Sequence, residues 1–182
     1  MVISPHGVAT AARSPQSQEE RTAWEVASRV VDPELPMLTL LDLGVLRDVA
    51  VDEDGGVVAA ITPTYSGCPA MATMRDDLVR ELQAAGFADV RVRVVLEPAW
   101  TTDWITAEGR AALTRAGISA PGRVRRTSGP MALQLMPTRR AIRCPRCGAE
   151  DVELTSEFGS TACKAMYRCT VCLEPFDHVK EI

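Results

Sequence analysis

The chain has 182 residues, a formal net charge of −4 and a sequence pI near 5.3, and 46% of its residues are hydrophobic. This acidic balance disfavours nucleic-acid binding, and no apolar run approaches the roughly 18 residues that a membrane-spanning helix needs. Six cysteines and no recognisable secretion signal predict a cytoplasmic protein in which thiols bind metal rather than form disulfides.

The N-terminal part predicts a tail and a helix. Residues 1–18 are small and polar without sustained periodicity, which is typical of a disordered segment. From Glu19, apolar residues recur at helical spacing through Trp24, and Pro33 excludes the α conformation at the residue before it. We therefore expect a first helix that ends near Val31.

The next part of the sequence predicts a three-stranded sheet and a second helix. Strands are expected at residues 46–51 and 57–62, because an acidic, glycine-rich turn joins them. A helix should begin near Pro69 with Cys68 close to its N-terminus, and the Val/Arg alternation over 90–94 predicts a third strand. Together these elements predict a fold of the α/β (α+β) class, a compact two-layer sandwich of a small three-stranded sheet and helices.

The rest of the chain predicts three further features. A short helix over 106–116 closes the sandwich domain, which is taken as residues 19–117. Residues 118–142 combine prolines, glycines and five arginines, which predicts a basic linker. The final part, residues 143–182, is too short to bury an adequate core and is expected to need a structural metal or a partner.

Two Cys-x-x-Cys motifs near the C-terminus form the strongest signal. Four thiolates on two tight turns can complete a tetrahedron around zinc, and the candidates are Cys144, Cys147, Cys169 and Cys172. Two redox-active dithiols are the competing interpretation, but neither pair opens a long predicted helix. A structural zinc ribbon is therefore predicted, although the spacing does not fix the metal. Cys163 could replace a ligand, pack as a buried hydrophobe or join an iron–sulfur site, and burial is the commoner outcome.

Cys68 is the second candidate. Amides at a helix N-terminus favour the thiolate, which is the reactive and metal-binding form, but a small buried hydrophobe is an equally good interpretation. Asp32, Glu34 and Asp42 could line a pocket beside it or serve as turn and cap residues, which is the usual role of such acids. No histidine lies near Cys68 in the sequence, so a Cys–His nucleophile pair is not expected.

A third candidate is a surface for a partner. Trp100 and Trp104 enclose two threonines and Asp103. Their indoles could pack against the sandwich or against a partner, and packing in the core is the commoner fate.

Several segments together resemble a known family. The sequences DPELP at 32–36, LGVL at 43–46 and TPTYSGCP at 62–69 are similar to those of small metal–sulfur cluster assembly domains related to SufT and the eukaryotic MIP-type targeting factors. The sequences PAWTTDW at 98–104 and FGSTACK at 158–164 extend the resemblance to the branch that serves the bacterial phenylacetyl-CoA ring epoxidase.

The resemblance runs from about residue 24 to residue 182, and it has functional implications. It implies an accessory subunit of a multicomponent oxygenase in aerobic phenylacetate catabolism, needed to mature a metal centre on a partner. It implies that Cys68 handles iron or an iron–sulfur cluster transiently, with Asp32, Glu34 and Thr62 as the other candidate residues. The implied partners are the other epoxidase subunits, including the reductase. The resemblance does not identify the client subunit, and a homodimer is one possible oligomeric state.

Two alternatives remain beside this hypothesis. The first is a nucleic-acid-binding or regulatory module that uses the zinc ribbon and the arginines around it, which the acidic pI disfavours. The second is a thiol enzyme with Cys68 as nucleophile, which the missing nearby base disfavours. The chain also lacks the Glu and Glu-x-x-His helices of a carboxylate di-iron site, so a non-catalytic accessory subunit is expected, and enzymatic activity stays open.

Overall fold

A computed structural model describes residues 17–65, 67–122 and 142–181 of the chain. The expected tail lies almost entirely outside these residues, as does most of the expected linker. The described residues divide into two compact units, with the division between Trp100 and Thr101. The domain bounds expected from the sequence stay a prediction.

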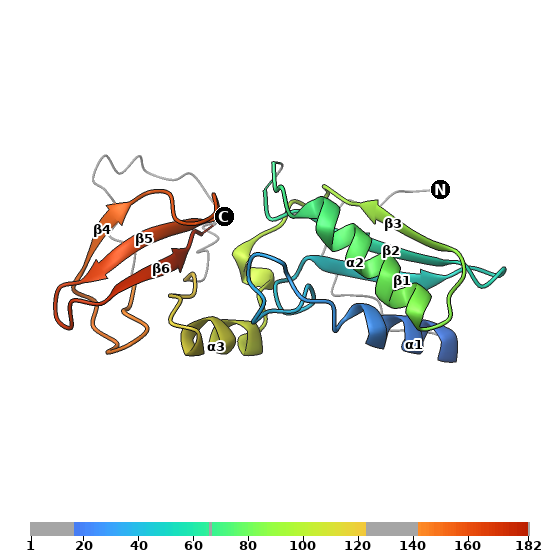
Figure 1. Cartoon of the computed structure of the whole chain (residues 1–182), viewed down its shortest axis with the longest axis horizontal. Helices are drawn as coiled ribbons and strands as arrows, with labels where there is room; N and C mark the ends of the chain where they lie inside the picture. The colour runs from blue at the N-terminus through green and yellow to red at the C-terminus, as the bar shows by residue number, and fades with distance from the viewer. Residues whose placement is uncertain (1–16, 66, 123–141, 182) are drawn as a thin grey trace, which may run out of the picture. The chain divides into compact units, whose positions relative to one another are not determined.

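The first unit is a three-stranded sheet with two helices. It contains α1 (Gln18–Ala27), β1 (Leu46–Val51), β2 (Val57–Ile61), α2 (Met71–Ala84) and β3 (Val90–Val94). The strand order is β1-β2-β3, with β1 antiparallel and β3 parallel to the central strand. Because α1 packs on β1, α2 packs on β3 and the two helices contact each other, both lie on one face of the sheet (Figure 1). The predicted two-layer sandwich is confirmed.

The first helix ends earlier than the sequence predicts. The hydroxyl of Ser17 accepts the amide of Glu20 at 3.0 Å and caps the start of α1. The helix ends at Ala27, whereas the prediction placed its end near Val31. The reason is a tertiary contact. The carbonyl of Val30 accepts the amide of Leu40 at 2.8 Å, and Val31 pairs with Thr39 in an isolated β-bridge. The backbone is therefore already extended ahead of Pro33.

The turn before α2 is longer than expected. α2 begins at Met71 with Ala70 as its N-cap, so the predicted start near Pro69 is two residues early. The amide of Cys68 donates to the carbonyl of Tyr65 at 3.2 Å, which places the thiol in the connecting turn rather than at the cap. The buried side of α2 repeats at a spacing of four residues, with Met74, Leu78 and Leu82.

The second unit combines a helical segment with the ribbon. It contains the 3-10 helix η1 (Thr102–Trp104), α3 (Ala107–Arg115), β4 (Val152–Ser156), β5 (Lys164–Cys169) and β6 (Pro175–Val179). The three strands form an antiparallel sheet in the order β4-β5-β6. Its core is small and includes two of the cysteines; the members are Ile142, Cys144, Ala165, Tyr167, Cys169 and Phe176.

The segment after α3 is attached to the ribbon. The amide of Ser119 donates to the carbonyl of Asp177 at 2.8 Å, and the amide of Val179 donates to the carbonyl of Ser119 at 3.1 Å. The first residues of the expected linker therefore extend the ribbon sheet beside β6.

Within the described residues, no helix is long and apolar enough to cross a membrane.

Candidate metal centre and the Cys68 region

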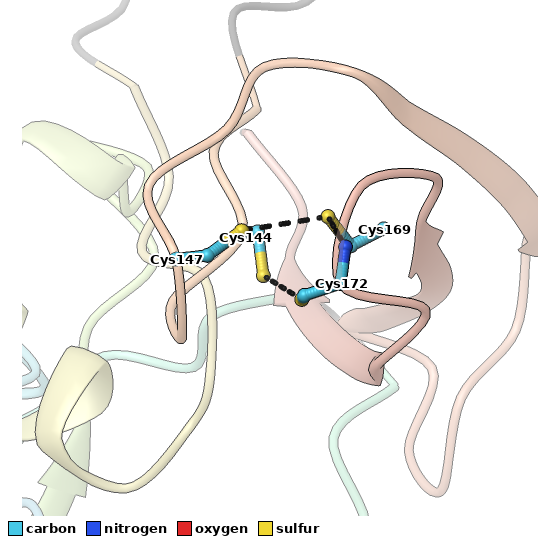
Figure 2. Close-up of side chains that lie close together, drawn as sticks. All are labelled: Cys144, Cys147, Cys169 and Cys172. Atoms are coloured by element: carbon cyan, nitrogen blue, oxygen red, sulfur yellow. Dashed lines mark hydrogen bonds between the residues drawn. The ribbon is translucent and has the colours of Figure 1, made fainter.

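The four cysteines of the two motifs converge on one point. Their sulfur atoms all lie within 4.8 Å of one another (Figure 2). The sulfurs of Cys144 and Cys172 are 3.7 Å apart, and those of Cys147 and Cys169 are 3.6 Å apart. Zinc bound to four thiolates at about 2.3 Å in a regular tetrahedron separates the sulfurs by about 3.8 Å. The cluster therefore has the donor set and the spacing of a metal-binding site.

The two motifs form turns of the same geometry. In each, the amide of the first cysteine donates to the carbonyl five residues later at 2.9 Å. In each, the residue after the second cysteine has a positive φ, +77° at Gly148 and 63° at Leu173. Glycine adopts this conformation freely, whereas a leucine there is strained. The common turn geometry aims all four sulfurs at one centre.

Electrostatics at the cluster also favour a bound cation. The amide of Cys172 donates to the sulfur of Cys169 at 3.4 Å and lowers the pKa of Cys169 to about 7. The amide of Glu174 lowers the pKa of Cys172, but burial and the neighbouring thiols outweigh it and raise that pKa to about 12. The neighbouring thiols raise the pKa of Cys172 because crowded sulfurs repel one another's negative charge, and a bound cation would offset this repulsion.

Cys163 is separate from this cluster. It is half-buried and its thiol lies 3.1 Å from the hydroxyl of Thr161. The group of potential ligands contains the four predicted cysteines without it. Cys163 is therefore positioned as a packed thiol at the start of β5 and not as a fifth member of the metal centre.

The Cys68 region lies in the connection between β2 and α2. Cys68 is half-buried and carries a reduced thiol. Thr62, which follows β2 directly, is almost fully buried, and its hydroxyl has no hydrogen-bond partner in the described part of the chain. A buried hydroxyl without a partner costs free energy, so this position is unusual for a residue with a purely structural role.

Two acids of the expected site, Asp32 and Asp42, accept hydrogen bonds within their own turns. A carboxylate oxygen of Asp32 accepts the amides of Glu34 at 2.8 Å and Leu35 at 2.7 Å. Asp42 accepts the hydroxyl of Thr39 at 2.7 Å. Among the described residues, no group of three or more potential ligands includes Cys68. The hydrogen bonds of Asp32 and Asp42 are therefore those of turn residues, whereas a ligand role for Glu34 stays a prediction.

The tryptophan segment splits into a buried and an exposed part. Trp100 is buried in the first unit, where its indole donates to the carbonyl of Leu43 at 3.0 Å. In the second unit, Asp103 is exposed and Trp104 is half-buried. Core packing, the commoner fate, is therefore observed for Trp100.

The sequence analysis did not identify Arg110, a residue of α3 that follows the tryptophan segment. The guanidinium of Arg110 donates to the carbonyl of Thr102 at 2.6 Å and also to the carbonyl of Pro121. It thereby joins the segments on either side of α3. Its place in a helix of mixed polarity gave no signal for this role.

Comparison with known families identifies both parts of the chain. A family model described as "Iron-sulfur cluster assembly protein" matches residues 20–99, and one described as "PaaD zinc beta ribbon domain" matches residues 129–180. An Escherichia coli protein whose name describes it as a subunit of 1,2-phenylacetyl-CoA epoxidase is 45% identical over 86% of this chain and 90% of its own length.

Two shorter relatives match the first unit. The iron–sulfur protein maturation auxiliary factor YitW of Bacillus subtilis is 35% identical over 47% of this chain and 83% of its own length. SufT of Staphylococcus aureus, also named as such an auxiliary factor, is 32% identical over 46% of this chain and 96% of its own length.

These matches define the class as an iron–sulfur assembly domain followed by a zinc ribbon domain. The E. coli match spans nearly the whole of both chains, including the ribbon. The chain therefore belongs to the PaaD family of phenylacetyl-CoA epoxidase subunits, and the family resemblance of the sequence is confirmed.

Proposed function

We propose that the chain is a non-catalytic accessory subunit of phenylacetyl-CoA epoxidase and that it helps to mature an iron or iron–sulfur centre on a partner subunit. The observation that carries the proposal is the β2–α2 connection. It contains a half-buried, reduced thiol at Cys68 and a buried hydroxyl at Thr62 that has no hydrogen-bond partner among the described residues, within the segment matched by the iron–sulfur assembly model.

The chemistry of this connection suits cargo that must leave again. A thiolate binds iron strongly, but Cys68 belongs to no group of three or more ligands in the described residues. Asp32 already accepts two amides, so its ligand capacity is reduced, while Glu34 stays a candidate ligand. The hydroxyl of Thr62 could donate to a sulfide or oxygen of the cargo. Iron held in this way needs further ligands, which the partner subunit supplies during transfer.

The ribbon metal has a different role in this proposal. The sulfur spacing and the four-thiolate donor set support zinc, which binds such sites as a structural ion. Zinc here would stabilise the fold of the ribbon, whose buried core cluster holds six side chains among the described residues. We expect about one zinc ion per chain.

The charge of the ribbon weakens the nucleic-acid alternative. Residues 142–181 contain five basic and seven acidic side chains. Four thiolates with one zinc ion add a further net charge of about −2. A phosphate backbone would therefore be repelled by this part of the protein.

The test is co-expression of the chain with the oxygenase and reductase subunits of the epoxidase. Replacing Cys68 with Ser should lower the iron content and the turnover of the client subunit at least several-fold while the chain keeps its thermal stability. Cys163→Ser is the matched control, because it removes another half-buried, reduced thiol outside both candidate sites. If Cys68→Ser lowers the stability of the chain but leaves client iron and turnover unchanged, Cys68 is a packing residue and the proposal fails.

A further inference from the structure

The ribbon has a pocket that no metal ligand lines. Its volume is about 150 Å³, and its lining consists of Leu154, Glu157, Ala165, Tyr167 and Lys180. Ala165 and Tyr167 belong to the buried core of the ribbon, so this core reaches the surface at the pocket. An engineered cavity of about 150 Å³ in another protein takes up benzene, which indicates that one large side chain is the right size of occupant.

Two exposed apolar side chains lie beside the two charged residues at the margin of the pocket. Leu154 is 48% exposed, and Phe158, the neighbour of the lining residue Glu157, is 68% exposed. The ammonium of Lys180 lies 4.5 Å from the centre of the Phe158 ring. The ring therefore has a fixed neighbour while most of its surface faces water. Covering these two side chains would remove apolar surface from water and stabilise a complex.

The charges at the pocket differ in how well they are solvated. Lys180 is half-buried, and its ammonium donates to the carbonyl of Ala162 at 2.9 Å. In the described part of the chain it forms no ion pair with a carboxylate. Glu157, on the other hand, is exposed. Because Lys180 is the less exposed of the two charged residues, a negative group next to it is the better complement.

The neighbouring strand disfavours pairing with an added strand. β4 is the edge strand of the ribbon sheet among the described residues. Its register shifts between Leu154 and Ser156, and such a bulge interrupts the regular row of backbone groups that strand addition requires. Insertion of a side chain into the pocket therefore fits the surface better than extension of the sheet.

We propose that this pocket docks a partner protein through one large apolar side chain next to a carboxylate that pairs with Lys180. The apolar side chain contacts Leu154, Tyr167 and Phe158. The proposal goes beyond the maturation role, because docking at the ribbon requires neither Cys68 nor iron. It assigns the ribbon a recognition role in addition to its metal centre.

The test uses the full-length, zinc-loaded chain with the photo-reactive residue p-benzoylphenylalanine in place of Phe158. The probe is the mixture of purified oxygenase and reductase subunits of the epoxidase. The matched control carries the same residue in place of Leu173, which is 59% exposed but lies in the second cysteine turn. We expect a cross-link from position 158 to one partner segment with an apolar residue within about two positions of Asp or Glu, and at least about tenfold less from position 173.

Charge variants complete the test. Lys180→Glu should lower the yield of the cross-link about tenfold, whereas Lys180→Arg should retain it. Leu154→Ala should also lower the yield of the cross-link. It should not reduce the zinc content, because the Leu154 side chain is exposed. Cross-linking should persist in Cys68→Ser, which separates this proposal from the maturation role. Equal yields at both positions, no cross-link, or a cross-link to residues 123–141 of the same chain or to a second copy would overturn the proposal.

Discussion

The ribbon and the β2–α2 connection both present thiols, and they differ in how many sulfurs converge. In the ribbon, four sulfurs lie within 4.8 Å of one another, whereas Cys68 belongs to no such group in the described residues. Four convergent thiolates hold a metal permanently, because the ion satisfies all of them at once. One thiolate leaves coordination positions open. The geometry of the ribbon therefore suits retention of a metal, and that of the β2–α2 connection suits the transfer that we propose.

Loss of a ribbon ligand should give the largest effect. Cys169 is fully buried and belongs to the ribbon core, so Cys169→Ser should abolish stoichiometric metal binding and unfold the second unit. Structural zinc contributes about 10 kcal/mol or more to such folds. Elemental analysis and amide hydrogen exchange would measure both effects. Retained zinc, or an iron–sulfur absorbance lost in the variant, would contradict the zinc assignment.

The first unit should lose stability without losing metal. Trp100→Phe removes a buried hydrogen bond to the carbonyl of Leu43 and leaves that carbonyl without its indole donor. We expect a loss of about 1–3 kcal/mol in the free energy of unfolding of the first unit, measured with urea, and unchanged zinc content. Trp104→Phe, at a half-buried position, is the control and should cost less. If Trp100→Phe instead lowered the zinc content, the stability of the first unit and the metal centre of the ribbon would not be independent.

The smallest effect should be a gain of stability in the ribbon. Leu173 has a φ of 63° and is 59% exposed, so Leu173→Gly relieves backbone strain and removes little packing. The expected gain is about 1 kcal/mol or less, because glycine also loses more conformational entropy on folding. Gly148→Ala, at the matching position with no atom near an added Cβ, should instead destabilise the ribbon. Thermal unfolding of the zinc-loaded protein would measure the stability of both variants. A loss of stability in Leu173→Gly would show that the backbone at Leu173 is not strained.

Local patterns predicted the parts of the fold that depend on local contacts. The bounds of β1 follow from the acidic, glycine-rich turn after it, and those of β3 follow from the Val/Arg alternation. The metal centre followed from cysteine spacing, because two short turns fix the positions of the sulfurs. The resemblance pointed to Thr62, but no pattern predicted that its buried hydroxyl would be unpartnered in the described part of the chain.

The misses arise from contacts between distant residues. The early end of α1 depends on the hydrogen bond between Val30 and Leu40, and the role of Arg110 depends on carbonyls on both sides of α3. The strained turn at Leu173 was hidden, because no glycine marks it. The pocket at Lys180 requires the folded ribbon sheet. Such features have no local sequence pattern.

Transfer of iron through Cys68 is the central claim, and one measurement tests it most directly. Purified, iron-free oxygenase and reductase subunits are mixed with the iron-loaded chain, and the iron acquired by each subunit is followed with time. The account predicts rapid acquisition by one subunit with the unchanged chain and with Cys163→Ser, and a rate with Cys68→Ser no greater than that with free ferrous iron. Equal rates for the unchanged chain and Cys68→Ser would contradict it.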